Sequence, residues 1–485
     1  MGGIAGYVDG FIDSTYHKNG DVIGSSYVGG IVGYSASVKN SYSIGDVTGE
    51  KNYVGGLVGS TYSVSKSFVV GNVKSDSNYV GGVVGLARGT IDSSYHKGGN
   101  VVGKSYVGGL AGIDSSSITN SFSEGDVIGS GNYIGGIVGG GVFSISKGYA
   151  KGSVNGIDYV GGLAGCAGFK AFVGIDSSYH TEGHVSGNSY VGGLVGIDSI
   201  FVQNSFSEGN VVGSNNYVGG LVGFTNSSVK NSYAEGEIKS DLNYVGGIAG
   251  YSKSIIDSSH HANGDVIGVS YVGGLAGYIA GTVNTSHFEG NVTGNGNYVG
   301  GLAGHGNAIS KGFAKGNVIG FSNYVGGLAG KATGMISSSF TEVLVSGVDT
   351  VGGLVGAGQK IKDSYASSPY VIGRNSVGGT VGYTTDSIKN SYFEGDSIVG
   401  IYQIGGLAGC AKSAVDSSYS TAHVKGDDNV GGLIGSAYGN VSNSYAIGNV
   451  IGDVEHSSAG NDNLGGLIGY QYGGSISKSM SLGNI

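Results

Sequence analysis

The sequence predicts an all-β protein whose chain coils into a parallel β-solenoid. A string of two glycines, two mostly apolar residues and a third glycine occurs 18 times, from GGIAG at Gly2 to GGLIG at Gly465. Successive copies are 26 or 27 residues apart, except for one interval of 31 and a last one of 34. A fixed period of this length indicates one supersecondary unit stacked many times. No window shows the 3.6-residue apolar period of a helix.

One repeat, residues 37–59, contains three short β-rich pieces separated by glycine or polar residues. We predict strands around Val38–Tyr42, Asp46–Thr48 and Tyr53–Val58. Three short strands in 26 or 27 residues suit one coil of a β-solenoid. A right-handed coil is favoured, because the left-handed hexapeptide form has a shorter turn. Propeller blades, at about 40–45 residues, are too long for this period.

Two neighbouring columns of the repeat contain nearly constant residue types. The position of Tyr42 is Tyr or Phe in 15 of 18 repeats, and the residue before it is Ser in 15 of 18. Since Tyr and Phe interchange, the ring matters more than the hydroxyl, and a stacked aromatic ladder is expected. The small residue before it indicates a tight bend or a ladder of hydroxyl groups.

The two glycines of the repeated string are expected to mark a bend or bulge where no Cβ fits. Val54, Leu57 and Val58 surround this step in one repeat. Strict alternation along a strand cannot place all three on one face. We therefore predict a local irregularity there.

A longer period lies above the first one. The string Ile/Val-Asp-Ser-Ser/Thr-Tyr/His recurs at intervals close to 80 residues, so three coils form one larger unit and six such units make 18 coils. This period reflects either the history of duplication or a ligand-matching spacing of about 14 Å on one face. The string begins at Ile12, Ile91, Ile175, Ile256 and Val415, with a degraded copy at Ile336.

Composition excludes several classes of protein. The net charge is −9, and Arg88 and Arg374 are the only arginines, so no basic stripe for nucleic acid exists. No run of 18 apolar residues predicts a membrane span. Cys166 and Cys410 lie nine repeats apart, too far for a disulfide, and are expected to be free thiols. Both ends of the sequence fall inside a repeat, so we expect residues 1–485 to be one continuous solenoid, uncapped at both ends, from a longer array.

Histidines recur in one column at every third coil. Zinc ligands must all lie about 2 Å from the metal. Residues three coils apart are separated by roughly 14 Å, so they cannot share an ion. We expect them to be solvated surface or ladder residues. The column contains His17, His96, His180 and His261.

Aspartates form a second column with the same three-coil spacing. Calcium requires 6–8 oxygen ligands, which a single column lacks unless carbonyls of the bend contribute. We expect these side chains to accept hydrogen bonds from backbone amides at a turn. No cofactor and no metal ligand is therefore assigned, and calcium stays open as the alternative for this column. The column contains Asp13, Asp92, Asp176, Asp257 and Asp416.

Segments that break the repeat are the best places for binding, because loops that leave a solenoid often carry it. The insertion at residues 167–174 contains Phe169 and Phe172, which have no ladder role. Residues 453–462 contain His456, and Tyr402 lies in a degraded repeat. These four residues are the candidate interaction sites.

The tandem strings GG-L/I/V-V/A-G resemble the GLUG motif along essentially the whole chain. This motif occurs in bacterial surface proteins, including haemagglutinin-like adhesins and the N-terminal regions of immunoglobulin A1-cleaving metalloproteases. The resemblance implies an extracellular, β-helical, non-catalytic surface module. It carries no catalytic residue over, and the zinc motif H-E-x-x-H does not occur here.

The expected function is that of a non-enzymatic, cell-surface structural or adhesive rod, acting as a stalk or a binding passenger. Its partner would be a protein or glycan on a host or neighbouring cell, or further copies of itself. One alternative is a self-assembling extracellular fibre subunit joined end to end. A second alternative is a carbohydrate-active β-helix enzyme. The scarcity of Arg and the lack of an acid cluster outside the repeat argue against the enzyme.

Overall fold

The computed structural model describes residues 1–168, 174–452 and 463–485, which contain β-strands and no helix. They form a parallel β-solenoid of about 16 turns, close to the 18 copies of the repeat. The chain divides into two compact units. Unit 1 comprises Met1–Ser240 and Ile248–Tyr251, and unit 2 comprises Asp241–Gly247 and Ser252–Ile485. The predicted fold class is confirmed.

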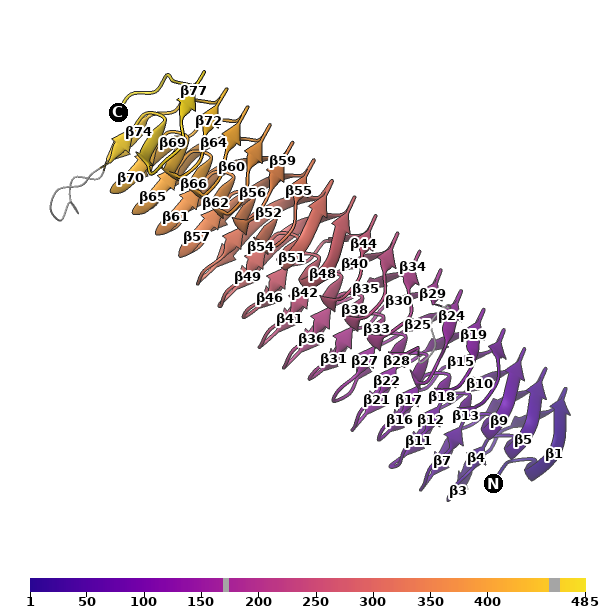
Figure 1. Cartoon of the computed structure of the whole chain (residues 1–485). Coiled ribbons are helices and arrows are strands. Elements are labelled where there is room, and N and C mark those ends of the chain that lie inside the picture. The colour runs from indigo at the N-terminus through magenta and orange to yellow at the C-terminus, as the bar shows by residue number, and fades with distance from the viewer. Residues whose placement is uncertain (169–173, 453–462) are drawn as a thin grey trace. The chain divides into compact units, whose positions relative to one another are not determined.

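A coil of unit 1 has four short strands on three faces (Figure 1). The strands are β4 (Val28–Gly29), β5 (Val32–Lys39), β6 (Tyr42–Ile44) and β7 (Val47–Gly49). Each pairs in parallel with the equivalent strand of the next coil, for example β6 with β10 (Phe68–Val70). Strands β6 and β7 belong to one sheet, whereas β4 and β5 each belong to a different sheet. Unit 1 is therefore built by in-register stacking of equivalent strands.

Several coils of unit 2 follow the same plan with longer strands. One coil contains β50 (Val299–Gly300), β51 (Ala303–Ser310) and β52 (Phe313–Gly320). Here β52 takes the place of the two short strands of unit 1. It pairs in register with β56 (Phe340–Ser346) of the next coil.

The bend between β5 and β6 lies inside a segment that the sequence predicted as one continuous strand. β5 ends at Lys39, Asn40 has a positive φ of 49°, and β6 begins at Tyr42. Asn is among the residues that enter the left-handed region most readily. The prediction of one strand over Val38–Tyr42 was wrong, because alternation alone does not reveal a single residue that turns the chain.

The serine column forms the predicted ladder of hydroxyl groups at this corner. The backbone N–H of Ser41 donates to Oγ of Ser67 at 3.1 Å, and that of Ser67 donates to Oγ of Ser94 at 3.2 Å. Each hydroxyl in turn donates to the carbonyl oxygen two residues before it, as Ser94 does to Asp92 at 2.8 Å. The hydroxyl thus satisfies a buried N–H of the preceding coil.

Replacing one of these serines is expected to destabilise unit 1. In Ser94→Ala the buried N–H of Ser67 loses its acceptor, and an unsatisfied buried donor costs about 1–3 kcal/mol. Urea denaturation followed by circular dichroism measures the loss. Ser93→Asn is the matched control: Ser93 has a positive φ of 50°, a position where other coils place Asn, and the expected change is within about 0.5 kcal/mol. Equal losses in both variants would contradict the assignment.

The Gly-Gly step is a bend imposed by lack of space. Val54, Leu57 and Val58 are all fully buried, as they could not be in a regular strand. β8 (Val54–Gly55) ends at this step, and β9 (Val58–Ser65) starts beyond it. A Cβ on Gly56 would lie 2.2 Å from the carbonyl oxygen of Gly82 in the next coil. The predicted irregularity is confirmed, and its cause is the close approach of neighbouring backbones.

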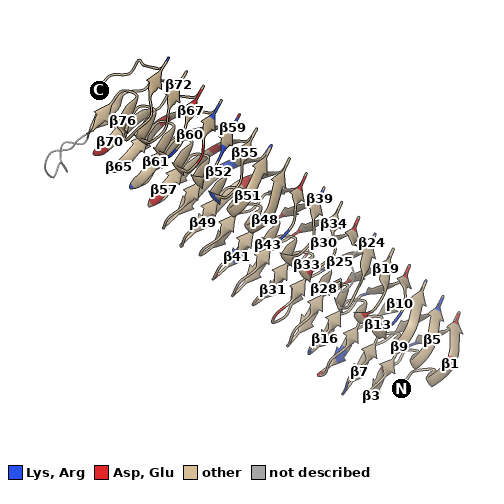
Figure 2. Cartoon of the chain, viewed as in Figure 1, with Lys and Arg blue, Asp and Glu red and all other residues tan. Residues whose placement is uncertain are grey.

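The aromatic column forms a continuous stack within each unit. Ring centroids are 4.6–5.3 Å apart from Tyr16 to Tyr233 in unit 1. In unit 2 they are 4.5–5.1 Å apart from Phe313 to Tyr445. His260 and His287 occupy the same column and stack at 4.7 Å. The predicted ladder is therefore confirmed. Lys, Arg, Asp and Glu residues are scattered along the ribbon of each unit (Figure 2).

Candidate functional site

A second aromatic column, which the sequence analysis did not identify, lies just before the Gly-Gly step. In unit 1 its tyrosines stack with centroids 4.7–5.2 Å apart. All have positive φ values, between 49° and 68°, which are unusual for bulky residues. The recurrence of Tyr directly before Val/Ile-Gly-Gly was the available signal. We call this set the tyrosine column: Tyr27, Tyr53, Tyr79, Tyr106, Tyr133, Tyr159, Tyr190 and Tyr217.

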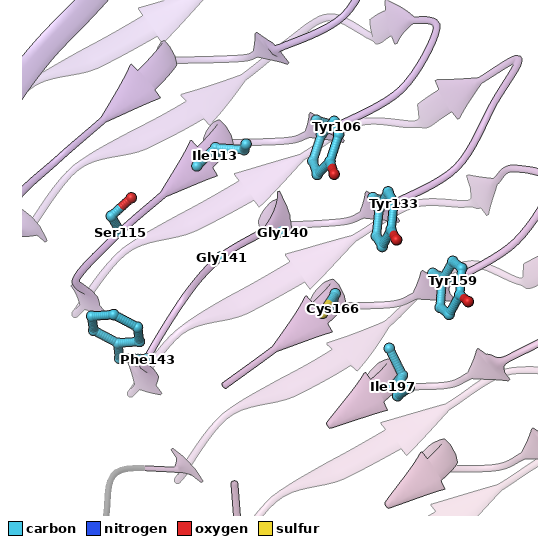
Figure 3. Close-up of a pocket in the computed structure, with 10 residues that line it drawn as sticks. All are labelled: Tyr106, Ile113, Ser115, Tyr133, Gly140, Gly141, Phe143, Tyr159, Cys166 and Ile197. Carbon is cyan, nitrogen blue, oxygen red and sulfur yellow. The ribbon is translucent and has the colours of Figure 1, made fainter. Parts of the chain in front are cut away.

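A groove of about 460 Å³ lies beside three members of this column (Figure 3). The tyrosine rings form one wall and Phe143 lies on the opposite side. We call it the tyrosine groove. It is lined by Tyr106, Ile113, Ser115, Tyr133, Gly140, Gly141, Phe143, Tyr159, Cys166 and Ile197.

The hollow exists because two residues of one outward-facing column are small. Ile113 belongs to β18 (Ala111–Asp114), and its register partner in the next coil is Gly140 of β23 (Val138–Gly140). In the following coils Cys166 pairs with Ile197. Between two isoleucines the column thus contains a glycine and a cysteine. A Cβ on Gly140 would meet only ring atoms of Tyr106 at 3.5 Å and Cys166 at 3.8 Å, which are ordinary contacts.

The described residues that line the groove include no charged side chain and no reactive thiol. Burial raises the pKa of the Cys166 thiol to about 11, with a smaller contribution from Asp198. Because the thiolate is the nucleophilic form, Cys166 is poorly suited to attack a substrate at neutral pH. Burial also raises the pKa of Tyr106 and Tyr133, whose hydroxyls stay protonated. The groove therefore offers an apolar surface with neutral hydroxyl groups. Cys166 and Cys410 are both free, as predicted.

Two buried carboxyl groups lie behind the rims of the groove. Asp114 follows Ile113, and Asp198 follows Ile197 in β33 (Val195–Asp198). Burial raises the pKa of Asp114 to about 7, partly offset by the N–H of Ser116, which donates to its Oδ1 at 3.1 Å. Burial raises the pKa of Asp198 to about 8, and the Thr225 hydroxyl offsets little of this. Neither oxygen of Asp198 accepts a hydrogen bond of ordinary geometry from the described residues.

Other coils show what this position requires. Ser35, Thr61, Thr225, Ser252 and Thr384 replace the aspartates there, and each hydroxyl donates to the carbonyl oxygen two residues later. A hydroxyl donor is therefore the usual solution at this turn. A protonated carboxyl group supplies such a donor, whereas a carboxylate does not.

Three of the four histidines of this column are buried in the core, so the expectation of solvated surface or ladder residues was wrong for them, whereas His17 is half-buried. His96, His180 and His261 have no exposed surface. Nε2 of His96 lies 2.8 Å from the carbonyl oxygen of Gly71, and Nε2 of His180 lies 2.9 Å from that of Gly152. Since a carbonyl only accepts, Nε2 carries the proton. Burial lowers the pKa of both histidines, which keeps them neutral.

The location of these histidines shows that the three-coil period is related to packing in the core. A Cβ on Gly82 would lie 2.6 Å from His96, and one on Gly162 would lie 2.5 Å from His180. The rings thus fill the space under the Gly-Gly step. In adjacent coils the same position is occupied by Ser123 and Ala150, which pair in register. From His96 to His180, one large core residue is thus followed by two small ones before the next large one.

The aspartate column binds side chains of the next coil, not the backbone amides that the sequence analysis expected. Asp13 accepts from Nδ2 of Asn40 at 2.8 Å, and Asp92 accepts from Asn120 at 3.1 Å and Thr119 at 2.6 Å. These hydrogen bonds lower the pKa of both carboxyl groups. The same partner type serves Asp176, Asp257 and Asp416 through Asn204, Asn284 and Asn443. Among the described residues no three His, Cys, Asp or Glu side chains could hold a metal ion together.

Of the four candidate residues from the sequence, Tyr402 alone lies among the described residues. Phe169, Phe172 and His456 lie outside the described residues. Tyr402 begins β65 (Tyr402–Gly405) and pairs in register with Asn375 and Asp428. Its side chain is exposed, but it lines no groove described here. Tyr402 is thus part of a regular coil, not of a loop that leaves it.

Unit 2 contains a polar counterpart of the tyrosine groove. A hollow of about 320 Å³ lies beside Tyr324, where Ala357 stands between Lys331 and Tyr383 in the outward-facing column. Nζ of Lys331 lies 6.0 Å from the centre of the Tyr324 ring. The same small-residue device therefore produces a groove with a cationic lining.

Comparison with known proteins gives one family match. The family model of the GLUG motif matches residues 24–48, 214–239 and 426–451. No curated protein and no solved structure matches the chain. Among the described residues no helix is long and apolar enough to cross a membrane.

Proposed function

We propose that this chain, which has a parallel β-solenoid fold and three segments that match the family model of the GLUG motif, is a non-enzymatic structural or adhesive module of an extracellular cell surface. It acts as a stalk, or as a passenger that binds a protein or glycan on another cell. No cofactor takes part in this role.

The observation that carries the proposal is the use of polar side chains between coils. Serine hydroxyls, aspartate carboxylates and buried imidazoles each bind a group of the neighbouring coil. Residues that perform chemistry in enzymes thus hold successive coils in register. The raised pKa of Cys166, about 11, also disfavours a nucleophilic role for the thiol. A repeat array stabilised by such nearest-neighbour contacts suits a scaffold.

Adhesion assays on the full chain test this proposal. Beads coated with the purified protein are expected to bind one or more members of a panel of cell surfaces and immobilised glycans, and to leave the bound ligand chemically unchanged. Beads coated with the guanidinium-unfolded chain are the control. Release of reducing or unsaturated sugar from a polysaccharide would overturn the proposal in favour of an enzyme. Filaments in electron micrographs of the purified chain would favour the fibre subunit.

A further inference from the structure

Outside the tyrosine groove, the outward-facing column contains aromatic residues that pack against the tyrosine column. Phe224, in β38 (Val222–Thr225), meets the ring of Tyr217 with centroids 5.7 Å apart and planes at 88°. It also meets Tyr190 at 6.2 Å and 67°. Tyr251 meets Tyr217 at 6.1 Å and 75°. Each is an edge-to-face contact.

Unit 2 repeats this arrangement with a different residue. The ring of His305, in β51, meets Tyr298 with centroids 5.7 Å apart and planes at 76°. An aromatic ring in this slot is therefore a recurrent solution of the repeat.

At the tyrosine groove no described residue places a ring in the same slot. Its column positions are Gly140 and Cys166, and the tyrosine column continues past them with Tyr106, Tyr133 and Tyr159 at 4.7 and 4.8 Å. The Cβ that Gly140 lacks would make ordinary contacts there. The backbone thus leaves room for a side chain that none of the described residues supplies.

The charge distribution of the tyrosine rings indicates which kind of ligand fits the groove. Because the tyrosine rings stack face to face along the column, they present edges to the groove, and ring edges carry partial positive charge. An aromatic face carries the complementary negative charge. None of the described residues that line the groove is charged, so these residues offer no ion-pair partner to a charged ligand.

We propose that the tyrosine groove binds an aromatic side chain of a partner polypeptide, in the slot that Phe224 fills in its own coil. This inference rests on the proposed adhesive function. An apolar cavity of about 150 Å³ accommodates benzene. The 460 Å³ of this groove therefore has space for a ring together with flanking backbone, which favours a side chain on a peptide over an isolated ring.

The test uses the full chain and N-acetyl-tryptophanamide as a peptide-like probe. The chain contains no Trp, so probe fluorescence is the only indole signal. We expect saturable binding with a blue shift, and competition by N-acetyl-phenylalaninamide. Competition by N-acetyl-cyclohexylalaninamide, which has a ring of similar size without a π face, is expected to be at least about fivefold weaker, a difference of about 1 kcal/mol as measured for aromatic pairs.

Three variants locate the site. Gly140→Phe fills the groove with the chain's own ring and is expected to weaken probe binding at least about tenfold, a change of about 1.4 kcal/mol. Leu86→Phe, in the same column but outside the groove, is the matched control and leaves binding unchanged. Phe224→Ala vacates the equivalent slot and is expected to add a second binding site for the probe.

Several outcomes would overturn the inference. They are no probe binding, equal competition by the cyclohexyl analogue, or binding that survives Gly140→Phe in a variant that retains the circular dichroism of the wild type. If Gly140→Phe does not fold, Phe224→Ala takes its place in the test. A second binding site for the probe in that variant supports the inference, and the lack of one overturns it. A groove that binds a neutral oligosaccharide instead would also overturn it. Because the probe assay involves no cells, its failure leaves the adhesion assay of the proposed function untouched.

Discussion

Gly136→Ala is expected to destabilise unit 1 by roughly 3 kcal/mol or more, since overpacking of a tight core costs about 1–3 kcal/mol and occasionally more. The added Cβ would lie 2.1 Å from the carbonyl oxygen of Gly162 and 2.7 Å from Cβ of Ala150. The first contact is with backbone of the next coil, which cannot move without disturbing its own stack. Guanidinium denaturation followed by circular dichroism measures the loss.

The same substitution four residues later is the control. In Gly140→Ala the new Cβ meets its nearest atoms at 3.5 Å, so we expect a change of less than about 0.5 kcal/mol. Because coils of a repeat protein can unfold separately, hydrogen exchange of the amides in residues 134–140 complements the denaturation curves. A small effect of Gly136→Ala would show that neighbouring coils separate more easily than the structure implies.

Asp198→Thr is expected to stabilise the protein at pH 8 and to have little effect at pH 4. The folded-state pKa of Asp198, about 8, lies above its ordinary value of 3.8. For a raised pKa, the stability is fully present below pH 3.8 and is lost as the pH rises through 8. Each pKa unit corresponds to about 1.4 kcal/mol, so the loss amounts to several kcal/mol. Threonine supplies the hydroxyl that other coils use there.

Thermal denaturation at pH 4, 6 and 8 measures this difference. Asp198→Thr is expected to gain stability relative to the wild type as the pH rises from 4 to 8, and a double variant with Asp114→Thr is expected to gain more. The variants are compared with one another because the buried histidines, whose pKa burial lowers, favour the folded state more as the pH rises and contribute equally to every variant. Asp92→Asn is the control, because hydrogen bonds lower the pKa of that carboxyl group instead of raising it. A stability difference between Asp198→Thr and the wild type that stays level from pH 4 to 8 would contradict a buried, protonated Asp198.

Much of the fold followed from columns that repeat in the sequence. The Gly-Gly string, the Ser-Tyr/Phe pair and the absence of a helical period were sufficient for stacked coils, a hydroxyl ladder and an aromatic ladder. These features depend on contacts between the same position in successive coils. A column of identical residue types in the sequence therefore identifies both residues of each contact.

The candidate site could not be read in this way. The tyrosine groove depends on Gly140 and Cys166 being small where their column neighbours Ile113 and Ile197 are large. It also depends on the neighbouring column of tyrosines with positive φ. Two columns that are adjacent only around a bend form the groove, and the bend geometry is absent from the sequence.

The sequence by itself determined the period, the parallel stacking and the residues that form ladders, because neighbouring coils repeat the same contact. The tertiary structure decided which columns face inward. It placed His96 in the core, directed Asp92 to the amide of Asn120 and buried the carboxyl group of Asp198. The physical reason is that a positive φ at single corner residues, such as Asn40, reorients all side chains that follow, and a period in sequence carries no information on that rotation.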